Sequence, residues 1–172
     1  VTMLPPVAVS LIYSESSAVI FLSAFSVTLL VGLLIWLPTR HSAYELRTRD
    51  GFIITVLFWL VLSVFGTLPF LFSNELKLSF VDALFESVSG LTTTGATVLS
   101  GLDDLPKSLL YYRQQLQWLG GIGIIVIAVA ILPMLGVGGM QIYRAEAPGP
   151  MKDTKITPRI TETATLLFKI YL

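Results

Sequence analysis

Cysteine is absent from the chain, and there is a single histidine, His41. Disulfides, thiolate nucleophiles, iron–sulfur clusters and zinc sites built from the usual ligands are therefore excluded. Charge is also scarce, at 13% of the 172 residues, against about 25% in an ordinary soluble domain. Eleven basic residues balance eleven acidic ones, so no positive field exists that could hold nucleic acid by its phosphates. The composition argues against a water-soluble fold and against nucleic acid as a partner.

The apolar residues are concentrated in three runs without a charged side chain, residues 16–39, 51–74 and 114–143. A membrane-spanning helix needs about 20 mostly apolar residues, because each residue rises about 1.5 Å and the hydrocarbon core is about 30 Å thick. In lipid the backbone hydrogen bonds must be satisfied within a helix or a closed barrel, and no alternating barrel pattern is present. The sequence therefore predicts an all-α membrane protein that crosses the bilayer several times.

Two further features qualify these runs. Residues 1–14 are also uncharged but are interrupted by Pro5 and Pro6 and are too short to span, so we expect the end of another helix; without Met or a basic stretch they do not resemble a signal peptide. In the third run, Pro133 and the glycines that follow it predict a bend, because proline removes a helical hydrogen bond.

The loop charges predict an orientation. Residues 40–50 and 144–159 together hold seven lysines and arginines, whereas residues 75–113 hold three, with five acids. Short basic loops stay in the cytoplasm, so we expect the two basic segments there and residues 75–113 outside. Because helices 51–74 and 114–143 run in opposite directions, the residues between them must start and finish on the same side. Any part of them that enters the bilayer must return.

Residues 79–90 have the pattern of a short amphipathic helix. Ser79 and Asp82 have the spacing of an N-terminal capping box, and Gly90 is the expected C-terminal cap. The apolar face is expected to contain Phe80, Ala83, Leu84 and Val88. Such a helix is about 18 Å long, so it can enter the membrane only part-way, as a re-entrant segment.

The next residues, 92–98, are Thr-Thr-Thr-Gly-Ala-Thr-Val. Threonines with one glycine are poor helix formers but suit an extended segment whose carbonyls turn to the same side. A potassium filter makes this demand, because the ion exchanges its water shell for backbone oxygens. Gly95 permits a peptide orientation closed to other residues, and the preceding helix points its negative end at the same place. We expect a hard monovalent cation as the ligand.

Three strings, FESVSGLTTTGATV (85–98), YYRQQLQWLGGIGIIVIAVAILPMLGVGGMQIYRAEAPGP (111–150) and KDTKITPRITETA (152–164), resemble the Trk/Ktr/HKT potassium transporters. The resemblance covers nearly the whole chain and implies an N-terminal portion. Residues 1–50 would form accessory helices and a cytoplasmic loop, and residues 144–172 a cytoplasmic linker and the start of the next pore unit. Residues 51–143 would be the first of four pore units, with M1 at 51–74, a re-entrant pore helix at 79–90, a filter at 92–98 and M2 at 114–143.

The same resemblance implies which groups bind the ion. The backbone carbonyls of Thr93, Thr94, Gly95 and Ala96 would contribute to the potassium sites, with Thr93 and Thr94 the metal ligands. The neighbouring Thr92 and Thr97 would support the filter. One unit supplies one of four filter segments, so the pore needs the missing units.

At the level of the whole protein, the resemblance implies potassium uptake, by symport or a channel-like route, across a bacterial inner membrane. The protein would be a multi-pass homodimer in the lipid bilayer, regulated by a cytosolic nucleotide-binding ring of the TrkA type. Potassium is the transported ion, and no organic cofactor is expected.

Several alternatives stay open. The chain could be a membrane scaffold that conducts nothing by itself, and residues 92–98 could be an ordinary polar turn. Asp82 and Glu86 could be a catalytic pair, but a polar face of the pore helix, exposed or hydrogen-bonded to neighbours, explains them better. Arg113 could be a functional charge or an interfacial anchor. An intramembrane enzyme is disfavoured because the three runs hold no ionisable acid, amine or imidazole.

The glycines at 120, 121 and 123 match no nucleotide-binding motif. Close packing of helices beside the filter is the better explanation for them.

Overall fold

The computed structural model describes residues 2–40, 48–130, 166 and 169–171. Within these residues the chain is helical and has no β-strand. The helices are α1 (Leu4–Ile12), α2 (Ala18–Thr39), α3 (Thr48–Gly66), α4 (Leu68–Phe72), α5 (Phe80–Leu91) and α6 (Lys107–Ala130), with a 3-10 turn at Leu102–Asp104 before α6. The predicted all-α architecture is confirmed for this part of the chain.

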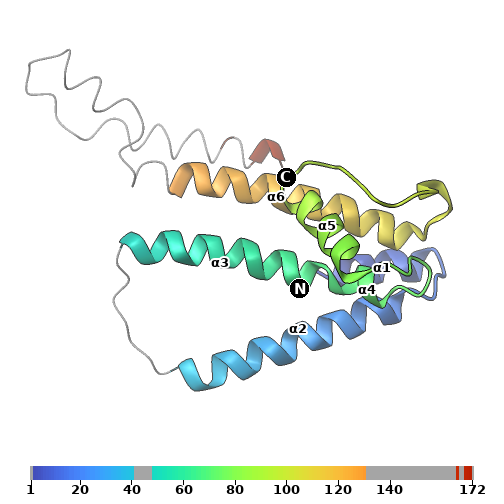
Figure 1. The fold of residues 1–172 in the computed structure, drawn as a ribbon, viewed down its shortest axis with the longest axis horizontal. Helices are drawn as coiled ribbons and strands as arrows, with labels where there is room; N and C mark the ends of the chain where they lie inside the picture. Colours follow the sequence, from blue (N-terminus) through green and yellow to red (C-terminus); the bar gives the residue numbers. More distant parts are fainter. Residues whose placement is uncertain (1, 41–47, 131–165, 167–168, 172) are drawn as a thin grey trace, which may run out of the picture.

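Three long helices, α2, α3 and α6, run roughly along the long axis of the molecule (Figure 1). The short helices α1 and α4 lie at the end where α6 begins, and α5 slants between α3 and α6 (Figure 1). Helix α5 contacts α3, α4 and α6, while α1 contacts α2 and α6. The short helix α5 thus packs against α3 and α4, which precede it, and against α6, which follows it.

Two helical segments among the described residues are long and apolar enough to cross a membrane, Ala18–Thr39 and Ile53–Phe72. The large side chains of α2 point outward: Leu34 is 70% exposed and Trp36 is 56% exposed. In water a continuous apolar face of this kind would cause aggregation, whereas lipid is a suitable surrounding. The first predicted span is thus a single helix, α2, whereas the second consists of α3 followed by α4. Much of the third run, with Pro133, lies outside the described residues, as do His41 and residues 144–159.

Prolines lie at the start of two helices, where the absence of their N–H group is tolerated. Pro5 and Pro6 occupy the first turn of α1, where a missing N–H costs nothing, so they start this helix and do not interrupt it as expected. Pro69 lies in the first turn of α4. Because its ring cannot continue the hydrogen-bond ladder of α3, the run at 51–74 is broken after Gly66 and is not one helix.

Helix α6 begins at Lys107, seven residues before the predicted start at 114. Its first N–H groups, those of Lys107 and Ser108, donate to the two carboxylate oxygens of Glu15 at 2.6 and 3.1 Å. Glu15 comes from the connection between α1 and α2. A carboxylate at a helix N-terminus satisfies unpaired donors and stabilises the helix dipole. The boundary therefore depends on a distant residue that the sequence pattern does not reveal.

Candidate functional site

The N-terminus of α5 has the predicted capping box. The Asp82 N–H donates to Ser79 Oγ at 3.2 Å, and Ser79 Oγ donates to Asp82 Oδ2 at 2.7 Å. These two bonds satisfy a free donor of the first turn and fix the point where the chain enters the helix. The spacing in the sequence identified this start correctly.

The C-terminus of α5 differs from the prediction. The helix continues through Gly90 to Leu91, and Thr93 adopts a left-handed conformation with φ 59°. The Thr93 N–H donates to the Gly90 carbonyl at 2.9 Å and the Thr94 N–H donates to the Ser89 carbonyl at 3.0 Å. This is the Schellman arrangement, with threonine in the position usually taken by glycine.

Gly90 has a different role from the expected cap. A Cβ atom on Gly90 would lie 2.9 Å from Leu116 Cβ of α6, so glycine is needed here because the two helices touch. The cap prediction was wrong because the packing partner of Gly90 comes from a segment far along the chain.

The buried face of α5 is also not the predicted one. Of the expected apolar face, Phe80 is 54% exposed and Val88 is 38% exposed, although Ala83 is fully buried. Glu86, Ser87 and Ser89 are buried instead (2%, 0% and 5% exposed). Lipid and further protein can cover an apolar surface, so in a membrane protein the polar side of a helix can face its neighbours, where hydrogen bonds are available.

Residues 92–98 leave the end of α5 without regular secondary structure and are exposed. The chain then runs back along α6 toward the end where α6 begins (Figure 1). A non-helical segment, entered by a short helix and followed by a return, is therefore present, but it is not extended throughout as expected, because Thr93 and Gly95 have positive φ. Gly95 has φ 73°, a conformation that glycine adopts without strain.

The leading part of this segment, residues 93–95, turns its N–H groups toward α5. In addition to the two capping bonds, the Gly95 N–H donates to the Ser89 carbonyl at 3.3 Å. Within the described part of the chain, the carbonyls of residues 93–95 accept no hydrogen bond. The next carbonyl, that of Ala96, accepts one from Ser89 Oγ at 2.6 Å. Three backbone oxygens are thus left available on an exposed surface.

The trailing part, residues 97–98, is held by one side chain. Glu86 Oε1 accepts from the Thr97 hydroxyl and, at 2.7 Å, from the Val98 N–H. Glu86 Oε2 accepts from Arg113 Nε of α6 at 2.9 Å. Glu86 is thus hydrogen-bonded to its neighbours, one of the expectations for this residue.

Of the two expected roles of Arg113, the interfacial anchor does not match the structure. The side chain is 9% exposed and forms an ion pair with a fully buried carboxylate. The two residues are 27 positions apart, and no motif links them. The sequence feature that could have predicted the pair is that Glu86 and Arg113 are opposite charges next to apolar helices, where charged residues are expected to pair.

The glycines of α6 pack closely, as predicted. A Cβ on Gly120 would lie 2.0 Å from the Leu91 carbonyl oxygen, and a Cβ on Gly123 would lie 2.8 Å from the Trp59 ring. Two side-chain bonds join the same helices: the Tyr112 hydroxyl donates to the Gly66 carbonyl at 3.0 Å, and Ser87 Oγ donates to the Ser63 carbonyl at 2.8 Å. The end of α5 is therefore clamped between α3 and α6.

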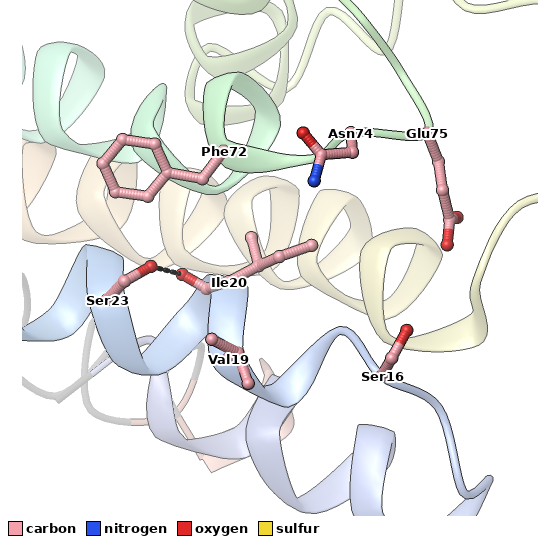
Figure 2. A pocket seen from close by; sticks show the side chains of 7 residues that line it. All are labelled: Ser16, Val19, Ile20, Ser23, Phe72, Asn74 and Glu75. Carbon is pink, nitrogen blue, oxygen red and sulfur yellow. Dashed lines mark hydrogen bonds between the residues drawn. The ribbon is translucent and has the colours of Figure 1, made fainter.

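A pocket of about 340 Å³ lies elsewhere, between the start of α2 and the residues that follow α4 (Figure 2). Its polar lining includes Ser23, whose hydroxyl donates to the Ile20 carbonyl of its own helix, and the exposed residues Asn74 and Glu75. None of its lining residues belongs to α5, α6 or residues 92–98. The pocket is separate from the candidate site.

The helix–segment–helix arrangement of α3, α5, residues 92–98 and α6 has counterparts among known proteins. Residues 17–172 match the family model described as TrkH, cation transport protein. The chain belongs to the TrkH family. The expected similarity to the Trk/Ktr/HKT transporters is thereby confirmed.

Individual members of the TrkH family are similar over the whole chain. The Trk system potassium uptake protein TrkH of Vibrio parahaemolyticus is 60% identical over 100% of this chain and 36% of its own length. TrkG of Escherichia coli K12 is 50% identical over 99% of the chain and 35% of its own length. The crystal structure of the potassium transporter TrkH from Vibrio parahaemolyticus aligns with a TM-score of 0.78 at 52% identity, over 99% of this chain and 33% of that one. The chain spans about a third of these relatives.

Proposed function

We propose that this chain supplies one of the four filter segments of a protein that takes up potassium across a bacterial inner membrane. In this proposal residues 1–50 are accessory helices and a cytoplasmic loop, and residues 51–143 contain the first pore unit, with M1 formed by α3 and α4, α5 as the pore helix, the filter at 92–98 and an M2 helix that begins with α6 at Lys107. Residues 144–172 link it to the next unit. Relatives that match the entire chain are named potassium uptake proteins.

The ion-binding groups are the carbonyls of Thr93, Thr94, Gly95 and Ala96. The observation that carries the proposal is the orientation of the leading part, whose N–H groups bond to α5 while the first three carbonyls accept nothing from the described residues. Carbonyl dipoles without a fixed charge can replace the hydration shell of potassium. The Ala96 carbonyl keeps one lone pair after bonding to Ser89.

Two threonines support these groups in the proposal. Thr92 Oγ1 and Thr94 Oγ1 share a hydrogen bond of 2.8 Å, and the Thr97 hydroxyl bonds to Glu86. These bonds direct the hydroxyls to each other and to α5, which leaves the main chain to face the ion.

The rest of the assembly is proposed from the resemblance to the Trk/Ktr/HKT transporters. We assign to the complete protein three further pore units, a homodimeric state and control by a cytosolic TrkA-type nucleotide-binding regulator. It would be a multi-pass protein of the inner membrane, transporting potassium without an organic cofactor and catalysing no reaction.

The test is rubidium uptake by the complete transporter in cells that lack other potassium uptake systems. Gly95→Ala places a side chain at φ 73°, which costs roughly 1–2 kcal/mol and favours a different peptide orientation. We expect uptake, or its preference for rubidium over sodium, to fall roughly tenfold, since about 1.4 kcal/mol corresponds to a factor of ten. Gly32→Ala is the matched control, since nothing lies within 4 Å of the added Cβ. Unchanged rate and selectivity in Gly95→Ala would refute the filter.

A second candidate function is a packing unit that conducts only with the missing units. The apolar side of α5 favours it, since Val81 is 72% exposed and Phe85 is 44% exposed, as expected for a surface that other parts of the protein cover. Rubidium flux is measured in liposomes containing either the 172-residue chain or the complete protein. Flux with the chain alone excludes this second function. Flux only with the complete protein is expected of both functions, and normal uptake by Gly95→Ala would then favour the packing unit over the filter.

A further inference from the structure

We propose that the Glu86 carboxylate, together with Arg113, is the positioning group for the trailing part of the filter and thereby sets ion selectivity. This inference rests on the proposed filter role of residues 92–98. It concerns two side chains that do not touch the ion, and it identifies the contact through which α6 and α5 together hold the filter.

The geometry of the carboxylate carries the proposal. Oε1 accepts two hydrogen bonds, from the Thr97 hydroxyl and from the Val98 N–H, and Oε2 accepts the third, from Arg113 Nε. The three donors belong to two different segments of the chain, so this one carboxylate connects the pore helix, the filter and α6. All three partners donate, which matches an ionised carboxylate that only accepts.

Burial makes this arrangement specific. The Glu86 side chain is 0% exposed, and that of Arg113 is 9% exposed. A buried charge without a partner is costly, and so is a pair from which one partner is removed. The carboxylate therefore stays where it meets both Arg113 and the Val98 N–H, and a different position of residues 97–98 would leave buried groups unpaired.

The leading part of the filter does not depend on this pair. Its N–H groups bond to the Ser89 and Gly90 carbonyls of the main chain, whereas residues 97–98 are bonded to the side chain of Glu86. Loss of Glu86 should therefore change the spacing between the Ala96 carbonyl and the earlier three without unfolding the end of α5. The spacing of the carbonyl oxygens determines which ion they can bind in place of its hydration shell.

The experiment uses the complete transporter in potassium-uptake-deficient cells and measures rubidium uptake with and without excess sodium. Glu86→Leu with Arg113→Leu removes both charges together, so no buried charge is left unpaired. We expect normal amounts in the membrane and a selectivity for rubidium over sodium that is roughly tenfold lower, because bonds to a charged group are lost. Glu86→Gln with Arg113→Gln retains a carbonyl oxygen for Val98 and should lose less selectivity.

Two further variants keep the test decisive. Thr97→Val leaves the ion pair intact and removes the hydroxyl that donates to Glu86 and accepts from the Leu99 N–H at 3.0 Å, so we expect about a threefold loss of selectivity. If the leucine variant does not accumulate, Thr97→Val decides the matter. Asp82→Asn is the control. Its carboxylate lies one turn earlier on α5 and, among the residues that the structure describes, bonds only to the cap residue Ser79, so selectivity should not change.

The outcomes separate this inference from the filter itself. If the leucine variant has wild-type selectivity, the positioning role is wrong; if that variant does not accumulate, the same result in Thr97→Val has the same meaning. In either case, loss of uptake or selectivity in Gly95→Ala would still support the filter. If Gly95→Ala transports normally, both the filter role and this inference are wrong. Equal losses in the leucine and glutamine variants would also contradict the proposal, because the retained acceptor would then have no effect.

Discussion

The two parts of the segment after α5 are held by different kinds of group. Residues 93–95 bond through their N–H groups to main-chain carbonyls of the helix they have just left, while residues 97–98 bond to the side chain of Glu86. The main-chain hydrogen bonds of residues 93–95 depend on the backbone conformation and not on the identity of the side chains. The hydrogen bonds of residues 97–98 depend on the identity of one residue and on its partner in α6. The trailing part is therefore more sensitive to substitution.

The largest effect should come from moving the main chain that holds the leading part. Gly120→Ala would place a Cβ 2.0 Å from the Leu91 carbonyl oxygen, so the end of α5 must shift. We expect rubidium uptake by the complete transporter to fall more than about tenfold and its melting temperature to drop, since overpacking costs roughly 1–3 kcal/mol. Gly32→Ala is the control for glycine replacement in a helix. Normal uptake in Gly120→Ala would show that the leading part tolerates displacement of α5.

A smaller effect is expected from Ser89→Ala. This change removes the hydroxyl that bonds to the Ala96 carbonyl but keeps the Ser89 carbonyl, which holds the Thr94 N–H. One lost hydrogen bond is worth about 1 kcal/mol, so selectivity should fall only a few fold. Ser26→Ala, which removes a bond within α2, should leave selectivity unchanged. A loss of selectivity as large as the loss of uptake in Gly120→Ala would contradict the view that main-chain hydrogen bonds hold residues 93–95.

Glu15→Gln tests the support of α6, the helix that carries Arg113. Burial alone would raise the pKa of Glu15, but hydrogen bonds from Ser108, Lys107 and Ser17 lower it below its usual 4.5. Its stabilisation of α6 is therefore fully present above pH 4.5 and is lost as the pH falls through the lowered pKa. At neutral pH the glutamine variant should be less stable by about 1 kcal/mol.

The measurement is thermal unfolding of both proteins between pH 7 and pH 3. The difference in melting temperature should shrink below pH 4.5, because the wild-type carboxyl is then also becoming neutral. A difference that is constant over this range would mean that the charge of Glu15 has no part in the cap.

The smallest effect is expected at Thr93, and it has the opposite sign. A β-branched residue at φ 59° is strained, so Thr93→Gly should stabilise the protein by less than about 1 kcal/mol after its entropy cost. Thr92→Gly, at φ −81°, gains no such relief and should destabilise. Melting temperatures of the two variants distinguish these results. If both are lowered equally, Thr93 carries no strain that glycine can relieve.

Several features of this protein could be predicted from short stretches of sequence. The apolar run at 16–39 is one helix, the run at 51–74 is helical but divided after Gly66, Ser79 caps α5, and the glycines of α6 lie at close helix contacts. Each prediction depended on run length, on a three-residue spacing or on the absence of a side chain. Such properties belong to one continuous stretch of the chain, so a local pattern contains them.

The tertiary structure decided what holds the site in place. The pairing of Glu86 with Arg113 spans 27 positions, and that of Glu15 with the start of α6 spans 92. The polar burial of α5 and the helical position of Gly90 likewise depend on which helix lies alongside. The role of a buried charge or of a missing Cβ depends on the group that packs against it. That group comes from a distant part of the chain, so only the folded structure identifies it.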